Sequence, residues 1–139
     1  MVKIVNAFIL SLSFLCFMAA GFSYSPYMAI NDNDTGGDCA TIGTWDASTK
    51  ICTLTSDISF ETINPGVYAI AIQINSPGIT LDGNGHTISG NGIGWGQVGV
   101  GMWAETTVKN LKLTGFDYAV VANGYVATPF SPSAENNKI

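Results

Sequence analysis

The sequence predicts an all-β protein in which short strands stack coil upon coil as a parallel β-helix. The first observation is a repeat: segment 79–90 (Ile-Thr-Leu-Asp-Gly-Asn-Gly-His-Thr-Ile-Ser-Gly) is partly echoed by segment 107–115 (Thr-Val-Lys-Asn-Leu-Lys-Leu-Thr-Gly). Short β-rich segments that return roughly every 25 residues and end in Gly are typical of solenoids. The second observation is a period of two among apolar residues such as Ile70, Ile72 and Ile74, which indicates strands with one buried face.

A constant register supports the same fold. Leu54, Leu81 and Val108 recur at steps of 27 residues, and Ile72 and Val100 lie 28 residues apart. Equivalent side chains of a solenoid stack above one another, so the first three residues are expected to form an internal ladder. A sandwich of hairpins would also contain alternating strands, but the constant register favours the solenoid.

Residues 1–21 are predicted to be a secretory signal peptide. Lys3 supplies a positive start, an apolar run covers 7–20, and small residues at 19–21 supply a cleavage site. The apolar run is short, so we expect no stable membrane span after signal cleavage. The protein is therefore expected to be secreted, cell-surface or periplasmic. An uncleaved N-terminal anchor and a lipoprotein modified at Cys16 remain as alternatives.

Residues 22–38 are polar and rich in turn formers, and we expect a flexible, mostly unstructured lead-in. Segment 32–38 places a glycine where an EF-hand calcium loop has one. Position twelve of such a loop falls on Gly43 rather than Glu, however, which favours a solvated linker. Residues 33–35 (Asn-Asp-Thr) also form an N-glycosylation sequon, a motif that is common by chance.

The folded part is expected to begin with a hairpin over 39–54, with a turn near 46–49. Cys39 and Cys52 are the only cysteines after the predicted signal peptide. An exported protein meets an oxidising compartment, where a disulfide between them would persist. The chain-entropy model predicts that closing this loop stabilises the fold by about 3 kcal/mol. A thiolate metal site would need further ligands.

Three coils are predicted within the folded region 39–127. They cover 52–74, 79–103 and 107–121, and no segment after the signal peptide has a helical apolar stripe. The tail, 128–139, is polar and interrupted by proline, so we expect it to be disordered. It offers no evident cap, and an open solenoid end exposes strand edges, which favours self-association.

Segments 79–90 and 108–116 resemble the coils of right-handed parallel β-helix proteins of the NosD-type and pectate-lyase-like group. The stretch from Cys39 to Thr55 resembles the N-terminal region of secreted members. The resemblance covers about residues 38–122 and implies a right-handed solenoid, here with about three coils and a disulfide-linked hairpin cap, whereas members usually have many more coils. It leaves function open, because such helices carry lyases, hydrolases, epimerases, adhesins and accessory proteins.

The charge balance excludes one class of function. The sequence has 10 Asp and Glu against 5 Lys and Arg, a formal net charge of −5, and it contains no Arg. A nucleic-acid-binding protein needs a basic surface to neutralise phosphates. We therefore expect no nucleic-acid partner.

The sequence gives little support for catalysis. His86 is the only histidine, and one imidazole cannot build a typical metal site, so we expect a coil-surface residue, no metal and no cofactor. The repeat places Asp82 near Thr55 and Lys109 rather than near the second carboxylate that glycoside hydrolysis needs. A role for Asp82 in hydrogen bonding the corner backbone is favoured.

Four residues are candidate polysaccharide contacts: Trp95, Tyr118, Asp82 and Asn110. Trp95 lies in a glycine-rich corner and is expected to project, although it could instead cover the helix edge. Exposed aromatic faces can stack on sugar rings, and the polar pair could hydrogen-bond along a shallow groove. The preferred interpretation is an exported, non-catalytic scaffold or surface protein that contacts polysaccharide. The alternatives are the N-terminal part of a carbohydrate-active lyase or hydrolase, and a periplasmic NosD-type accessory protein for metal-centre maturation.

Overall fold

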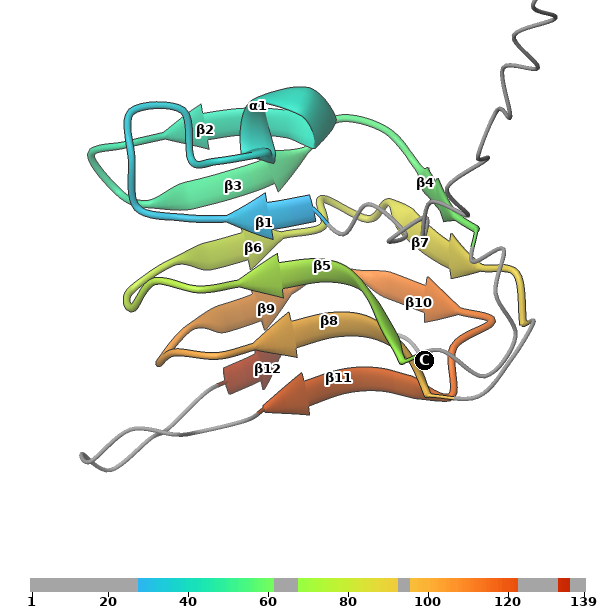
Figure 1. Cartoon of the computed structure of the whole chain (residues 1–139). Helices are drawn as coiled ribbons and strands as arrows, with labels where there is room; N and C mark the ends of the chain where they lie inside the picture. The colour runs from blue at the N-terminus through green and yellow to red at the C-terminus, as the bar shows by residue number, and fades with distance from the viewer. Residues whose placement is uncertain (1–27, 62–67, 93–95, 123–132, 136–139) are drawn as a thin grey trace, which may run out of the picture.

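The computed structural model describes residues 28–61, 68–92, 96–122 and 133–135, and these residues form mainly short strands (Figure 1). The strands are β1 (Met28–Ile30), β2 (Gly43–Asp46), β3 (Ile51–Leu54), β4 (Ile58–Phe60), β5 (Ala69–Ile74), β6 (Thr80–Asp82), β7 (Thr87–Gly90), β8 (Gln97–Met102), β9 (Thr107–Lys109), β10 (Lys112–Thr114), β11 (Tyr118–Ala122) and β12 (Ser133–Glu135). One four-residue helix, α1 (Cys39–Ile42), accompanies them in the described part of the chain. The all-β prediction is confirmed. No helix in the described ranges has the length and apolar character needed to cross a membrane.

The strands form three sheets, which we name A, B and C. Sheet A has the order β1-β5-β8-β11, sheet B the order β12-β9-β6-β3-β2, and sheet C the order β10-β7-β4. From β3 to β11 the chain visits sheets B, C and A in turn three times, and β12 then returns to sheet B. Each visit adds a strand beside the one laid down before it, and these neighbours are parallel (Figure 1).

The predicted register holds for the later coils. Leu81 lies opposite Val108 in sheet B, and Ile72 lies opposite Val100 in sheet A. All four side chains are fully buried. The sequence repeat therefore identifies true neighbours on adjacent strands.

The first step of the predicted ladder is wrong. Leu81 lies opposite Cys52 rather than Leu54, so the register between β3 and β6 differs by two residues from the expected one. A shift of two leaves each side chain on its original face, because strand side chains alternate with a period of two. Leu54 is accordingly still buried, and the apolar pattern alone cannot distinguish the two registers.

The core lies between the sheets and is aliphatic. Adjacent strands contribute one inward-facing residue each to stacked columns, and burying each such side chain stabilises the fold by about 1.5–3 kcal/mol. The fully or almost fully buried members of this cluster include Ile30, Leu54, Ile72, Ile74, Ile79, Leu81, Ile88, Val100, Val108, Leu111 and Leu113.

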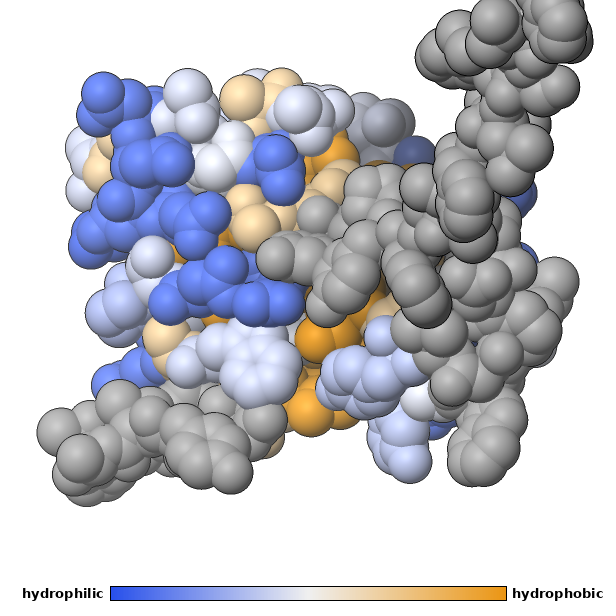
Figure 2. Space-filling model, in the orientation of Figure 1, coloured by the Kyte–Doolittle hydropathy of each residue, from blue (hydrophilic) through white to orange (hydrophobic). Residues whose placement is uncertain are grey.

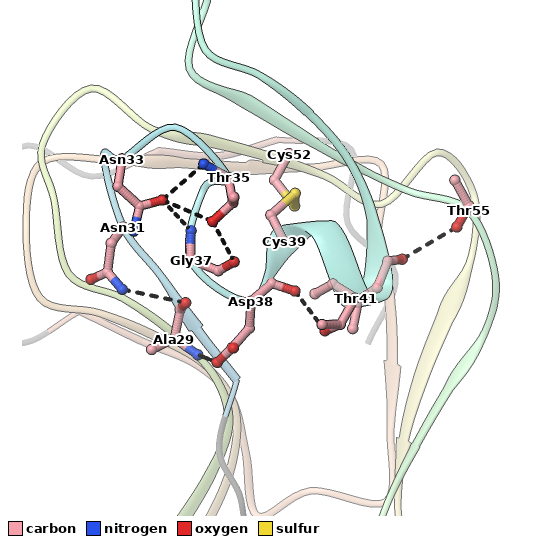
Figure 3. The surroundings of a disulfide bond; sticks show 11 residues. Ala29, Asn31, Asn33, Thr35, Gly37, Asp38, Cys39, Thr41, Cys52 and Thr55 are labelled. Carbon is pink, nitrogen blue, oxygen red and sulfur yellow. Dashed lines mark hydrogen bonds between the residues drawn. A yellow bond between two sulfur atoms is a disulfide. The ribbon is translucent and has the colours of Figure 1, made fainter.

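The predicted hairpin and disulfide are confirmed. Strands β2 and β3 pair in antiparallel fashion from Gly43 opposite Leu54 to Asp46 opposite Ile51. The Cys39–Cys52 disulfide joins α1 to β3, with 5.8 Å between the Cα atoms, and both cysteines are fully buried. Residues 39–42 form α1 instead of the expected strand (Figure 3).

The expected unstructured lead-in is wrong for residues 28–38. Strand β1 pairs in parallel with β5, and Ile30 is fully buried. The loop that follows is held by its own side chains: the Asn33 Oδ1 accepts three hydrogen bonds, and the Asp38 Oδ2 accepts one from the Ala29 N–H at 2.8 Å (Figure 3). Apolar burial and internal hydrogen bonds offset the entropy cost of ordering this polar segment.

The expected disordered tail is wrong at residues 133–135, which form β12 and pair in parallel with β9. Strand pairing uses backbone N–H and C=O groups that every non-proline residue carries, so a polar composition does not exclude it. The rest of the tail, like the predicted signal peptide, lies outside the described residues.

Candidate functional site

The outer face of sheet A carries several apolar side chains. Ile70 on β5 and Val98 on β8 are buried, yet neither belongs to the core cluster between the sheets. The period of two is therefore wrong for Ile70, which does not share the inward face of Ile72 and Ile74. A Cβ placed on Gly101 would lie 3.3 Å from Ile70 and 3.4 Å from the indole nitrogen of Trp103, so both side chains cover β8 at this glycine. Figure 2, which views the molecule from the side of β5, β8 and β11, shows apolar patches over β8 and β11 and hydrophilic residues over the end of β5.

Two tyrosines stand on this face. Tyr68 and Tyr118 are the exposed large apolar side chains of the described residues, with exposed fractions of 55% and 56%. The Tyr68 ring lies against Gly96, 3.2 Å from the place where a Cβ would stand. Tyr118 lies beside Val98 in the parallel pairing of β11 with β8. The two exposed rings therefore flank β8, one from the residue before β5 and one from the first residue of β11.

The outer faces of sheets B and C are polar by contrast. In sheet B, Thr80 lies opposite Thr107 and Asp82 lies opposite Lys109. In sheet C, Thr87 lies opposite Lys112, and the hydroxyl oxygens of a Ser pair, one on β4 and one on β7, lie 3.5 Å apart. Among the three sheets, the apolar and aromatic outer surface is thus that of sheet A.

Asp82 lies at the corner between sheets B and C, where its carboxylate contacts residues of its own coil and of the next coil. Its Oδ1 accepts hydrogen bonds from the Asn84 backbone N–H at 2.9 Å and from the Asn110 Nδ2 at 3.1 Å, and its Oδ2 lies 3.4 Å from the Lys109 Nζ. Burial acts to raise the pKa of Asp82, but these hydrogen bonds and the Lys109 charge outweigh burial and lower the pKa. Asp82 therefore stabilises the corner as a carboxylate.

The same corner requires unusual backbone conformations. Asn84 and Asn110 have φ of 50° and 54°, in the left-handed region that asparagine tolerates better than most residues. The Asn110 carbonyl accepts a hydrogen bond from the Gly85 N–H at 2.8 Å. A Cβ on Gly83 would lie 2.6 Å from the same carbonyl oxygen, so the backbones of the two coils approach closely here. Asn110 is accordingly a corner residue, with its side chain bonded to Asp82.

A second polar pair lies on the sheet C side of this corner, and sequence reasoning missed it. The Asp57 Oδ1 accepts hydrogen bonds from the Thr87 N–H at 2.9 Å and from the His86 Nδ1 at 3.2 Å. The Thr87 hydrogen bond, followed by that of His86, lowers the pKa of Asp57. His86 is half-buried, as a coil-surface residue would be. The step of 29 residues from Asp57 to His86 is close to the repeat length and could have signalled the contact.

The structure does not bring the four predicted polysaccharide contacts together. Asp82 and Asn110 contact each other at the corner between sheets B and C, whereas Tyr118 starts β11 in sheet A. Trp95 lies outside the described residues. Tyr68 and Trp103, which share the outer face of sheet A with Tyr118, were not among the predicted contacts.

The described residues contain no group of three or more His, Cys, Asp or Glu side chains placed to hold a metal ion. The Asp57–His86 pair is a hydrogen bond between two coils. No protein-family model, no curated protein and no solved structure matches the chain.

Proposed function

We propose that the chain is an exported, non-catalytic scaffold protein built as a right-handed parallel β-helix. The recurring order of sheets B, C and A supports this architecture, as does the in-register stacking of Leu81 on Val108. The Cys39–Cys52 disulfide supports export, because disulfides persist in oxidising compartments. In this proposal the three sheets are the faces of one solenoid.

The outer face of sheet A is the proposed surface for an extended polysaccharide. The observation that carries this proposal is the exposure of Tyr68 and Tyr118 on one apolar face. Tyr68 immediately precedes β5 and Tyr118 starts β11, and these strands lie on either side of β8. The rings are therefore roughly 10 Å apart across the sheet, two strand spacings, and are offset along it, because Tyr68 lies at Gly96 and Tyr118 at Val98. Aromatic rings present apolar faces on which the C–H faces of sugars stack. A chain of sugar rings laid across the strands could contact both tyrosines.

Binding assays on a panel of neutral and acidic polysaccharides test this surface. Tyr68→Ala and Tyr118→Ala should each raise the Kd by about tenfold or less, because one aromatic contact is worth about 0.5–1.5 kcal/mol. Tyr68→Phe and Tyr118→Phe should retain most of the affinity, since the ring persists. Thr80→Ala, on the polar outer face of sheet B, is the matched control. Unchanged binding in the double alanine variant would overturn the proposed surface.

Self-association is the second proposed property. Strands β10, β11 and β12 each lie at one edge of their sheets. One backbone edge of each is therefore unpaired among the described strands. Such edges are templates for pairing with another chain. Size-exclusion chromatography with light scattering should detect oligomers that grow with protein concentration, and a monomer at all concentrations would exclude this property.

A further inference from the structure

We propose that Asn33 is the attachment site for an N-linked glycan. This inference rests on the export proposed above, because the transfer takes place on the exported side of a membrane. Asn33-Asp34-Thr35 satisfies the Asn-x-Ser/Thr requirement, with a residue other than proline in the middle. No other asparagine in the sequence does so.

The loop presents the sequon to solvent. Residues 33–35 lie between β1 and α1, outside all three sheets, and all three are exposed. The loop is anchored on both sides: Asp38 accepts a hydrogen bond from the Ala29 N–H, and Gly36 lies against the Trp45 ring. A bulky glycan on Asn33 would therefore project from a fixed surface position.

The two halves of the Asn33 amide have different surroundings. The Oδ1 accepts hydrogen bonds from the Thr35 N–H at 3.1 Å, the Thr35 Oγ1 at 3.2 Å and the Gly37 N–H at 2.7 Å (Figure 3). The Nδ2 has no hydrogen-bond partner within the described part of the chain. The oxygen thus holds the loop while the nitrogen stays available.

Glycan transfer uses only that nitrogen. The Asn33 Nδ2 forms a bond to the anomeric carbon of an oligosaccharide carried on a lipid pyrophosphate. The bond from that carbon to the pyrophosphate oxygen breaks, the lipid pyrophosphate leaves with the electron pair, and the Nδ2 proton passes to a base of the transferase. The product keeps Oδ1 as an acceptor, so the three hydrogen bonds within the loop persist.

The test is expression of the full chain in a secretory host that carries an oligosaccharyl transferase, followed by peptide mapping by mass spectrometry. The peptide containing Asn33 should carry hexose-containing mass increments, and an amidase that releases N-glycans should leave Asp at position 33. Asn84 and Asn110, which lie outside any sequon, are the internal controls and should stay unmodified.

Three variants separate glycan loss from misfolding. Asn33→Asp keeps the acceptor oxygen and the loop but lacks the nucleophile, so it should fold and lose the glycan completely. Thr35→Ala should also lose the glycan, whereas Thr35→Ser should retain it, because the motif accepts either hydroxyl residue.

A second arm separates failure of export from failure of the site. If the chain is retained with its N-terminus uncleaved, the export proposal fails, and the full chain is then expressed behind a signal peptide of the host. Translocated protein that carries no glycan on Asn33 in that arm overturns the inference. Glycan that persists in Asn33→Asp would overturn it equally, because the modification would then lie elsewhere.

Discussion

Gly90 and Gly115 meet backbone to backbone where sheet C turns toward sheet A. A Cβ on Gly115 would stand 2.3 Å from the Gly90 carbonyl oxygen, and a Cβ on Gly90 would stand 2.5 Å from the Gly115 carbonyl oxygen. Gly115 also has a φ of 72°, which L-residues rarely adopt. The close stacking of these two coils therefore depends on the absence of side chains at both positions.

Gly115→Ala is predicted to be strongly destabilising. The new methyl group meets backbone that cannot rotate away, and the left-handed conformation adds roughly 1–2 kcal/mol of strain. Gly85→Ala is the matched control, because Gly85 has a φ of 81° but no atom within 4 Å of a Cβ position. Urea unfolding should give a larger loss of unfolding free energy for Gly115→Ala. Equal losses would mean that backbone strain alone matters and that the corner can open.

Reduction of the Cys39–Cys52 disulfide is predicted to lower the free energy of unfolding by about 3 kcal/mol, because the cross-link limits the entropy of the unfolded chain. Urea unfolding with and without a thiol reductant measures this difference. A Cys39→Ala/Cys52→Ala double variant should be destabilised and should no longer respond to reductant. A reductant effect that persists in the double variant would show that the loss has another origin.

Leu81→Ala should cost about 2–5 kcal/mol, the range for leucine truncation in a packed core. Leu81 is fully buried between Cys52 and Val108 on the neighbouring strands. Thr80→Ala, one residue away on the outer side of the same strand, should change stability much less. Thermal unfolding of both variants would check which face of β6 is buried, and a reversed order would contradict the inward position of Leu81.

The sequence predicted the repeat because buried apolar residues recur at a nearly constant spacing, as Ile72 and Val100 do. It predicted the hairpin and the disulfide because Cys39 and Cys52 are the only cysteines that follow the predicted signal peptide. It could not place Leu54 against the correct neighbour, since a shift of two residues preserves every buried face. It also missed β1, which is three residues long and pairs with β5 through backbone groups.

The candidate site was less predictable for a related reason. The pattern identified Tyr118, but Tyr68 precedes a strand and only the pairing of β5, β8 and β11 brings both tyrosines to one face. Asp82 was predicted to hydrogen-bond the corner backbone, and Asp82 and Asn110 were both predicted as polysaccharide contacts. The sequence did not show that their side chains hydrogen-bond each other, because that contact depends on the left-handed conformations of Asn84 and Asn110.

Asp82 is predicted to make stability depend on pH. Its pKa in the folded chain is lowered, whereas an unperturbed Asp titrates near about 3.9. The contribution of Asp82 is therefore fully present above about pH 4 and is lost as the pH falls through the lower, folded-state pKa. Asp82→Asn should be less stable than the native chain near neutral pH, by about 1 kcal/mol for each hydrogen bond weakened. It should also lose less stability on acidification.

Urea unfolding between neutral pH and about pH 2 would measure this dependence. The variant should keep part of the acid sensitivity, because hydrogen bonds, chiefly from the Ser48 side chain, lower the pKa of Asp46 to about 2, and the Thr87 N–H lowers the pKa of Asp57. Asp34→Asn, at an exposed position far from the corner, is the control and should match the native curve. If Asp82→Asn matched it as well, the carboxylate would not stabilise the corner, and Asp82 would again be available as a contact for a bound polysaccharide.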